Sequence, residues 1–155
     1  MRRALILSCG FLLAAVLRAE SGYDAWLRYS PVKNPPALPA AVVARGNTAV
    51  ILSARQELIR GIRGMVGHTL RIEAGSPAEG AIVLDVRPGA SDGFQLETRG
   101  QSIFITGSSD RGVLYGVFEL LRKIALGESI AALKEARSPY TPVRWVNHWD
   151  NLDGS

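Results

Sequence analysis

The chain has few residues that bind metals or form covalent cross-links. It holds one cysteine, Cys9, and two histidines, His68 and His148, which lie far apart in the sequence. A single cysteine excludes an internal disulfide, and a zinc site needs three or four clustered ligands. We therefore expect no metal ion and no other cofactor.

A basic nucleic-acid surface is also missing. The formal net charge of the chain is +4, but no cluster of Lys and Arg interleaved with aromatic residues occurs in its 155 residues. The stretch "GSSDRG" (107–112) precedes a predicted helix, but Val113 follows Gly112 where a phosphate-binding loop has Lys. Nucleic acid and nucleotide phosphates are therefore not the expected partners.

The first 19 residues have the layout of a secretory signal peptide. Arg2 and Arg3 precede an apolar run from Ala4 to Leu17, and small residues follow. The run is shorter than the roughly 20 apolar residues of a membrane-spanning helix, although an uncleaved anchor is the alternative. We expect cleavage after Ala19 and a secreted or periplasmic protein. Cleavage would leave 15 Lys and Arg against 14 Asp and Glu, so the basic character belongs to the leader.

Regular patterns begin after the proline-rich stretch "KNPPALPA". The run "TAVILS" (48–53) suits a short buried strand, and Ser53 with Gln56 suits a capping box for the helix that follows. That helix carries an apolar stripe and ends at Gly67. Within it, Gly61 and Gly64 permit close approach of a neighbouring segment.

Two strands, a hairpin and a second helix follow. "TLRIEA" (69–74) and "GAIVLDV" (80–86) predict two strands, and "GFQLETRGQSIFITG" (93–107) predicts a hairpin that turns at Arg99–Gln101. The segment 108–126 is the clearest helix, capped by Ser108, Ser109 or Asp110, with Gly112 and Gly116 leaving a groove for close packing. A further short helix is expected before Pro139. The order predicts an α+β domain: a small mixed or antiparallel sheet with two helices on one face.

Polar and aromatic residues gather near residue 150. Trp149, Asp150 and Asn151 suit a sugar pocket, because an indole ring covers C–H surface while polar neighbours bind hydroxyls. Packing of Trp149 at a domain boundary is the alternative. Asp150 and Asp153 are not expected to work alone as a catalytic pair, and His68 is interpreted as a turn residue.

Three stretches together resemble one family. "GYDAWLRY" (22–29), "DRGVLYGVFELLR" (110–122) and "NHWDNLDGS" (147–155) have the order and spacing of the N-terminal part of the α-glucuronidases of glycoside hydrolase family 67. The resemblance runs from Gly22 to the end. Its middle motif is the least specific, because accessory domains of other glycosidases carry a similar helix.

The resemblance implies the following organisation. Residues 20–138 would form an accessory domain similar to the second domain of chitobiases, and residues 139–155 a linker and the first strand of a (β/α)₈ barrel. The family removes glucuronic acid or its 4-O-methyl ether from xylan-derived oligosaccharides by inverting hydrolysis, and dimerises through a C-terminal domain. The catalytic carboxylates would lie beyond Ser155, so we expect the 155-residue chain alone to be inactive and only Trp149, Asp150 and Asn151 to touch substrate.

Two other functions stay open. The chain can be a free-standing accessory or carbohydrate-binding module without catalysis, in which residues 139–155 pack back onto the sheet. It can also be an interaction domain of another glycosidase, such as a hexosaminidase relative, although "NHWDNLDG" favours the glucuronidases.

Overall fold

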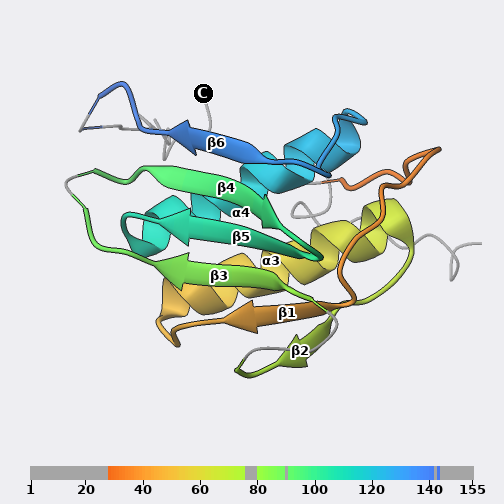
Figure 1. Cartoon of the computed structure of the whole chain (residues 1–155), viewed down its shortest axis with the longest axis horizontal. Coiled ribbons are helices and arrows are strands. Elements are labelled where there is room, and N and C mark those ends of the chain that lie inside the picture. The colour runs from red at the N-terminus through yellow and green to blue at the C-terminus, as the bar shows by residue number, and fades with distance from the viewer. Residues whose placement is uncertain (1–27, 76–79, 90, 142, 144–155) are drawn as a thin grey trace, which may run out of the picture.

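The computed structural model describes residues 28–75, 80–89, 91–141 and 143, which form a sheet covered by helices. In chain order its elements are β1 (Ala41–Ala44), α3 (Ala49–Val66), β2 (Arg71–Glu73), β3 (Ile82–Val86), β4 (Phe94–Arg99), β5 (Ser102–Gly107), α4 (Asp110–Ala125) and β6 (Lys134–Arg137). Both helices lie on the same face of the sheet, as Figure 1 shows. The predicted two-layer α+β architecture is confirmed.

The sheet is mixed, with six strands in the order β2-β1-β3-β5-β4-β6. Strands β2, β1, β3 and β5 run parallel to one another, whereas β4 is antiparallel to both β5 and β6. The predicted hairpin is β4–β5, which turns at Gly100, where φ is 57°. A left-handed backbone of this kind suits glycine.

The expectation for residues 48–53 is wrong, because this run starts α3 and is not a strand. Thr48 caps the helix: its Oγ1 accepts a hydrogen bond from the Ile51 amide at 3.3 Å. Ser53 is not a cap, since its hydroxyl donates to the Ala49 carbonyl within the helix. One strand that the sequence reading missed is β1, which directly follows the proline-rich stretch. The helix does end at Gly67, as predicted, with φ at 83°.

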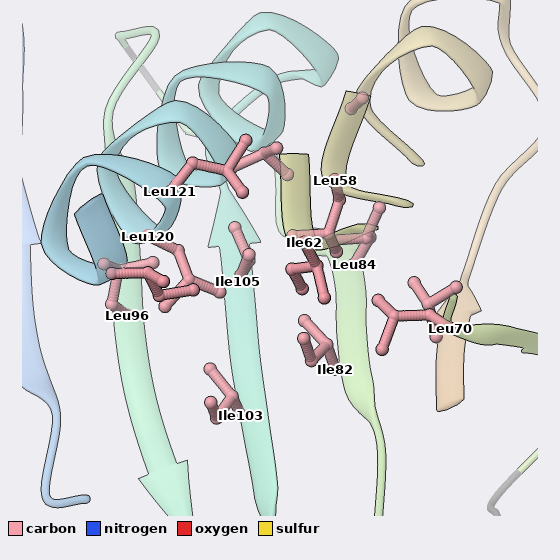
Figure 2. Packing of buried hydrophobic residues seen from close by; sticks show 14 of the residues in the cluster. Leu58, Ile62, Leu70, Ile82, Leu84, Leu96, Ile103, Ile105, Leu120 and Leu121 are labelled. Carbon is pink, nitrogen blue, oxygen red and sulfur yellow. The ribbon is translucent and has the colours of Figure 1, made fainter. Parts of the chain in front are cut away.

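The main core lies between the helices and the sheet (Figure 2). Leu58 and Ile62 of α3 and Leu120 of α4 are fully buried there, with Ile82 and Ile105 of the sheet beneath them. Burial of each such side chain contributes roughly 1.5–3 kcal/mol. A smaller apolar cluster, Ala41, Val43, Ala81 and Val83 with Phe104, lies on the opposite face of the sheet.

Close contacts between layers occur where helices carry glycine, as predicted. A Cβ on Gly116 would lie 2.6 Å from Cγ2 of Ile105, and one on Gly112 would lie 2.3 Å from the Gly93 carbonyl oxygen. In α3, a Cβ on Gly61 would lie 2.6 Å from a methyl group of Leu121, and one on Gly64 would lie 2.8 Å from Cβ of Tyr29. Any side chain at these positions would force the layers apart.

The segment after α4 is not the short helix expected before Pro139. Ile130 and Leu133 enter the main core, and the chain then forms β6, which pairs with β4 from Phe94↔Arg137 to Glu97↔Lys134. The Thr98 hydroxyl donates to the Ile130 carbonyl at 2.8 Å and accepts from the Leu133 amide at 3.2 Å. These contacts fix the turn that leads into the edge strand.

Candidate functional site

The end of the sheet at which its parallel strands finish is the natural place to look for a site. Strands β1, β3 and β5 end there, and both helices begin there (Figure 1). In open sheets with parallel strands, ligands bind outside the carboxyl ends of the strands. The polar residues at this end of the sheet therefore decide whether the described part of the chain holds reactive groups.

The carboxylates of Asp85, in β3, and Asp110, at the start of α4, are bound by other side chains of the protein. Asp85 lies 3.3 Å from Nη1 of Arg45 and 4.0 Å from Nε of Arg87. The Thr48 hydroxyl, which also caps α3, donates to Asp110 at 2.6 Å and so joins the starts of the two helices. These side chains hold together the loops at the carboxyl ends of the strands.

The start of α4 is occupied by a carboxylate. Ser109 caps the helix by accepting from the Gly112 amide at 3.1 Å, and its hydroxyl donates to Asp92 at 2.6 Å. Nε of Arg111 lies 3.3 Å from the other oxygen of Asp92. Because an anionic side chain already lies at the positive end of the helix, the interpretation of "GSSDRG" as a capped helix start is confirmed.

An ion-pair network joins the end of α4 to β6. The ammonium of Lys123, whose side chain is buried, lies 2.7 Å from Glu135 and 2.9 Å from Glu128. Glu119 is bound by Arg122 at 2.9 Å and by Arg137 at 3.0 Å. Six residues thus make a balanced set of charges: Glu119, Arg122, Lys123, Glu128, Glu135 and Arg137.

This network shifts the proton equilibria of its members toward the charged forms. The hydrogen bond from Arg122 lowers the pKa of Glu119, and hydrogen bonds from Lys123 and Arg122 lower the pKa of Glu128. Hydrogen bonds to Glu135 and Glu128 raise the pKa of Lys123. Carboxyl groups held as anions in this way suit structural ion pairs and not general acids, which need a raised pKa.

A segment before β1 lies across the two helices. Tyr29 donates to Glu57, and Arg60 binds the same carboxylate at 2.7 Å while its guanidinium lies 4.9 Å from the centre of the Tyr29 ring. A groove of about 550 Å³ lies beside this segment, lined by Lys33, Asn34 and Leu126 among others. The Tyr29 ring and hydroxyl are engaged by the protein, so none of the described residues that line this groove offers a free aromatic ring.

The described ranges contain no group of three or more His, Cys, Asp and Glu side chains placed to hold a metal ion. Within those same ranges, no helix combines the length and the apolar character needed to cross a membrane.

Comparison with known proteins gives a consistent result. The model of the glycosyl hydrolase family 67 N-terminus matches residues 25–120. The chain belongs to this family. The resemblance expected from the three sequence motifs is confirmed.

Curated relatives of this family 67 domain are named as α-glucuronidases. A probable α-glucuronidase A of Aspergillus terreus is 37% identical, with 93% of this chain and 20% of that protein aligned. The α-glucuronidase A of Emericella nidulans is 36% identical over 98% of this chain and 20% of that protein. The chain therefore spans about a fifth of the length of these relatives.

A solved structure, a GH20 β-N-acetylhexosaminidase from Streptomyces coelicolor A3(2), is 18% identical with a TM-score of 0.46, over 68% of this chain and 23% of that one.

In this family 67 domain, the motif "DRGVLYGVFELLR" is a packing motif. Its glycines, Gly112 and Gly116, are the positions at which α4 touches the β4–β5 hairpin. Its charged residues Glu119 and Arg122 belong to the network that holds β6. The motif therefore specifies how helix and sheet meet and not a catalytic group.

The predicted substrate residues Trp149, Asp150 and Asn151 lie outside the described residues, as do His148, Asp153, the leader 1–19 and most of "GYDAWLRY". His68 is exposed in the turn between α3 and β2, where it was expected. The sequence reading missed Tyr29, Glu57 and Arg60 as a connected group. No local signal links residues that are 28 positions apart, so only the fold reveals this contact.

Proposed function

We propose that this chain is the N-terminal domain of a secreted α-glucuronidase. The complete enzyme would remove glucuronic acid or 4-O-methylglucuronic acid from xylan-derived oligosaccharides by inverting hydrolysis. The observation that carries the proposal is the alignment of nearly the whole chain with proteins named α-glucuronidase A, at 36–37% identity. The family match over residues 25–120, which include α3, strands β1 to β5 and most of α4, supports it.

The role of the domain itself is structural and not catalytic. Inverting hydrolysis needs two carboxyl groups about 6.5–9.5 Å apart with room for a water molecule, and one of them must stay protonated. In the described part of the chain, Asp85, Asp92 and Glu119 are each bound by arginine. Their ion pairs stabilise loops and the β6 edge of the sheet. This arrangement supports a structural role for the domain within the complete enzyme.

Substrate contact would come from the segment after β6. Trp149 would place its ring against the C–H face of a sugar, and Asp150 and Asn151 would bind hydroxyls. In the complete enzyme we expect Trp149→Ala to raise KM more than it lowers kcat, because ring stacking acts in both the bound and the transition state. An unchanged KM would remove Trp149 from the pocket.

The first experiment is the mass of the native polypeptide in its source, detected with an antibody against residues 40–130. A species several times heavier than the 16.7 kDa chain, purifying together with glucuronic acid release from aldouronic acids, is the expected result. A species at or below 16.7 kDa that binds xylo-oligosaccharides would favour the free-standing module and overturn the proposal.

Four further measurements test the mechanism, the export and the oligomeric state. The 155-residue chain alone should release no glucuronic acid above the blank. For the complete enzyme, proton NMR of the first-formed sugar should show the β-anomer if hydrolysis inverts the α-linkage. Secretion predicts an exported protein whose N-terminal sequence begins at Glu20. A homodimer through the C-terminal domain predicts that the complete enzyme, but not this chain, sediments as a dimer.

A further inference from the structure

The chain leaves the sheet through a segment that exposes apolar side chains. Strand β6 ends at Arg137, and residues 138–141 and 143 follow it. Tyr140 is fully exposed and Val143 is 62% exposed. The Thr141 hydroxyl donates to the Val143 carbonyl oxygen at 3.0 Å, so the segment that carries them has a hydrogen bond of its own. A single exposed apolar residue is ordinary, but two in one short segment begin a patch.

The first half of α4 adds a second aromatic side chain next to this segment. Glu119 of α4 binds Arg137, the last residue of β6, at 3.0 Å. Tyr115, which is 36% exposed, precedes Glu119 by four residues, so both lie on the same face of the helix. Figure 1 shows that α4 begins at the end of the sheet at which β6 finishes. Tyr115 is therefore on the side of the domain from which the chain continues.

The charged groups around this surface are bound to one another. Arg137 contacts Glu119 and, at 3.7 Å, Glu135. At the start of α4, Arg111 lies 3.3 Å from Asp92. A partner can therefore bury the apolar side chains here without leaving these charges unpaired. Depletion of free charge together with enrichment in tyrosine characterises the buried centre of protein–protein interfaces.

The continuation of the chain is the partner that these observations favour. The matched family model describes an N-terminus, and the chain aligns with 20% of the length of a probable α-glucuronidase A. In an enzyme of that length, the remaining part is joined to this domain through the segment that begins at residue 138. The stretch "KEARSPYTPV" (134–143) holds two prolines and no glycine, so the connection is stiff and favours a fixed position of the domain that follows.

We propose that Tyr140, Val143 and Tyr115 form the surface on which the following catalytic domain packs. This inference rests on the proposed function, because it requires the complete enzyme. The two domains then hold one fixed orientation, whereas domains that share a small interface usually move relative to one another.

The test compares side-chain accessibility in the 155-residue chain and in the complete enzyme. Hydroxyl radicals modify exposed side chains, and mass spectrometry gives the rate of modification at each residue. Tyr140 should be modified about tenfold more slowly in the complete enzyme, because the centre of an interface excludes water, and Tyr115 should also be modified more slowly. Ile72, which is exposed at the opposite edge of the sheet, should be modified at the same rate in both proteins.

Variants locate the interface. In the complete enzyme, Tyr140→Ser combined with Val143→Ser should make tryptic cleavage after Arg137 about tenfold faster, because the connection opens more often. Ile72→Ser, a change at a similarly exposed apolar residue, is the matched control and should leave cleavage unchanged. In the 155-residue chain the double variant should keep the thermal midpoint, since both side chains are already exposed there. The labelling experiment needs no variant, so it decides the question if the double variant does not fold.

An active α-glucuronidase in which Tyr140 is labelled as fast as in the 155-residue chain would overturn the docking surface and leave the proposed function intact. Protection of Tyr140 in the 155-residue chain by xylo-oligosaccharides would overturn it in favour of a sugar platform. Protection that rises with the concentration of the chain would overturn it in favour of a second copy. A native polypeptide of 16.7 kDa would remove the proposed function itself, and the docking surface with it.

Discussion

The two edges of the sheet are built differently. At one edge, β6 is joined to α4 through Lys123 and Glu135 and through Arg137 and Glu119. At the other edge, β2 has three residues, and its ion pair, Arg71 with Glu73, lies within the strand itself. Both strands are short and charged, which discourages pairing with another chain. Ion pairs between described residues also bind the β6 edge to the helix layer.

The difference shows what each edge leaves free. At β6, charged groups of both signs are paired across elements, so little uncompensated charge remains for a ligand. At β2, Ile72 is exposed and Arg55 has no ion pair with the described residues. The same sheet therefore has one edge closed by its own side chains and one edge that presents an apolar surface next to a cation.

The largest expected contrast comes from truncating one apolar residue near each edge. Leu96, in β4 beside β6, is fully buried, so Leu96→Ala should lower the free energy of unfolding by about 2–5 kcal/mol. Ile72→Ala should change it by less than about 0.5 kcal/mol, because the side chain is mostly exposed. Urea denaturation measures both. Equal losses for the two variants would show that Ile72 is covered in solution by a further segment or molecule.

The next largest change in the free energy of unfolding should come from removing the buried ammonium group of Lys123. Lys123→Met keeps the aliphatic stem but removes the partner of Glu128 and Glu135, and should cost about 1–2 kcal/mol. Lys134→Met, an exposed change in β6 itself, is the matched control and should be close to neutral. Thermal unfolding of the two variants, compared with the unmodified chain, measures the difference. A neutral Lys123→Met would mean that pairing with β4 alone holds the edge.

Acid should open the β6 edge first. The folded-state pKa values of Glu119 and Glu128 are lowered by their cationic partners, so their ion pairs stabilise the protein above the unfolded-state pKa of about 4.3. This stability is lost as the pH falls below that value through the lowered folded-state pKa. Hydrogen exchange should show earlier loss of protection in β4–β6 than in β1–β3. Simultaneous loss in both pairs would argue against a separate role for the network.

The smallest effect should come from the ion pair at the β2 edge. Arg71 and Glu73 are partly or largely exposed, so Arg71→Ala should change the free energy of unfolding by less than about 0.5 kcal/mol. Denaturation in low and high salt checks this, because a screened surface pair should respond little to the mutation at either salt concentration. A loss comparable to that of Lys123→Met would show that both edges are held by charge.

Several elements were predictable because their signals are local. The stripe of α4, its cap within Ser108–Asp110 and the turn at Gly100 depend on residues close in sequence, and the structure confirms them. The glycines in both helices also indicated close packing correctly. The prediction for residues 48–53 was wrong because, by periodicity alone, a short apolar segment suits a buried strand and a helix start equally well.

The edge strand β6 was not predicted from the sequence, for a different reason. Residues 134–137 have no alternating apolar pattern, and they form a strand because β4 offers an open edge about 40 residues earlier in the chain. Pairing partners at such separation leave no local trace. The candidate sugar residues Trp149, Asp150 and Asn151 stay predictions, since they lie outside the described residues.

The sequence by itself determined the family, the two-layer class and most of the helix and strand positions, because motifs, caps and turns act over a few residues. The tertiary structure decided the strand order, the closing of the β6 edge by six charged side chains and the isolation of Arg55 beside Ile72. These features depend on contacts between distant segments, where burial and charge pairing act through space and not along the chain.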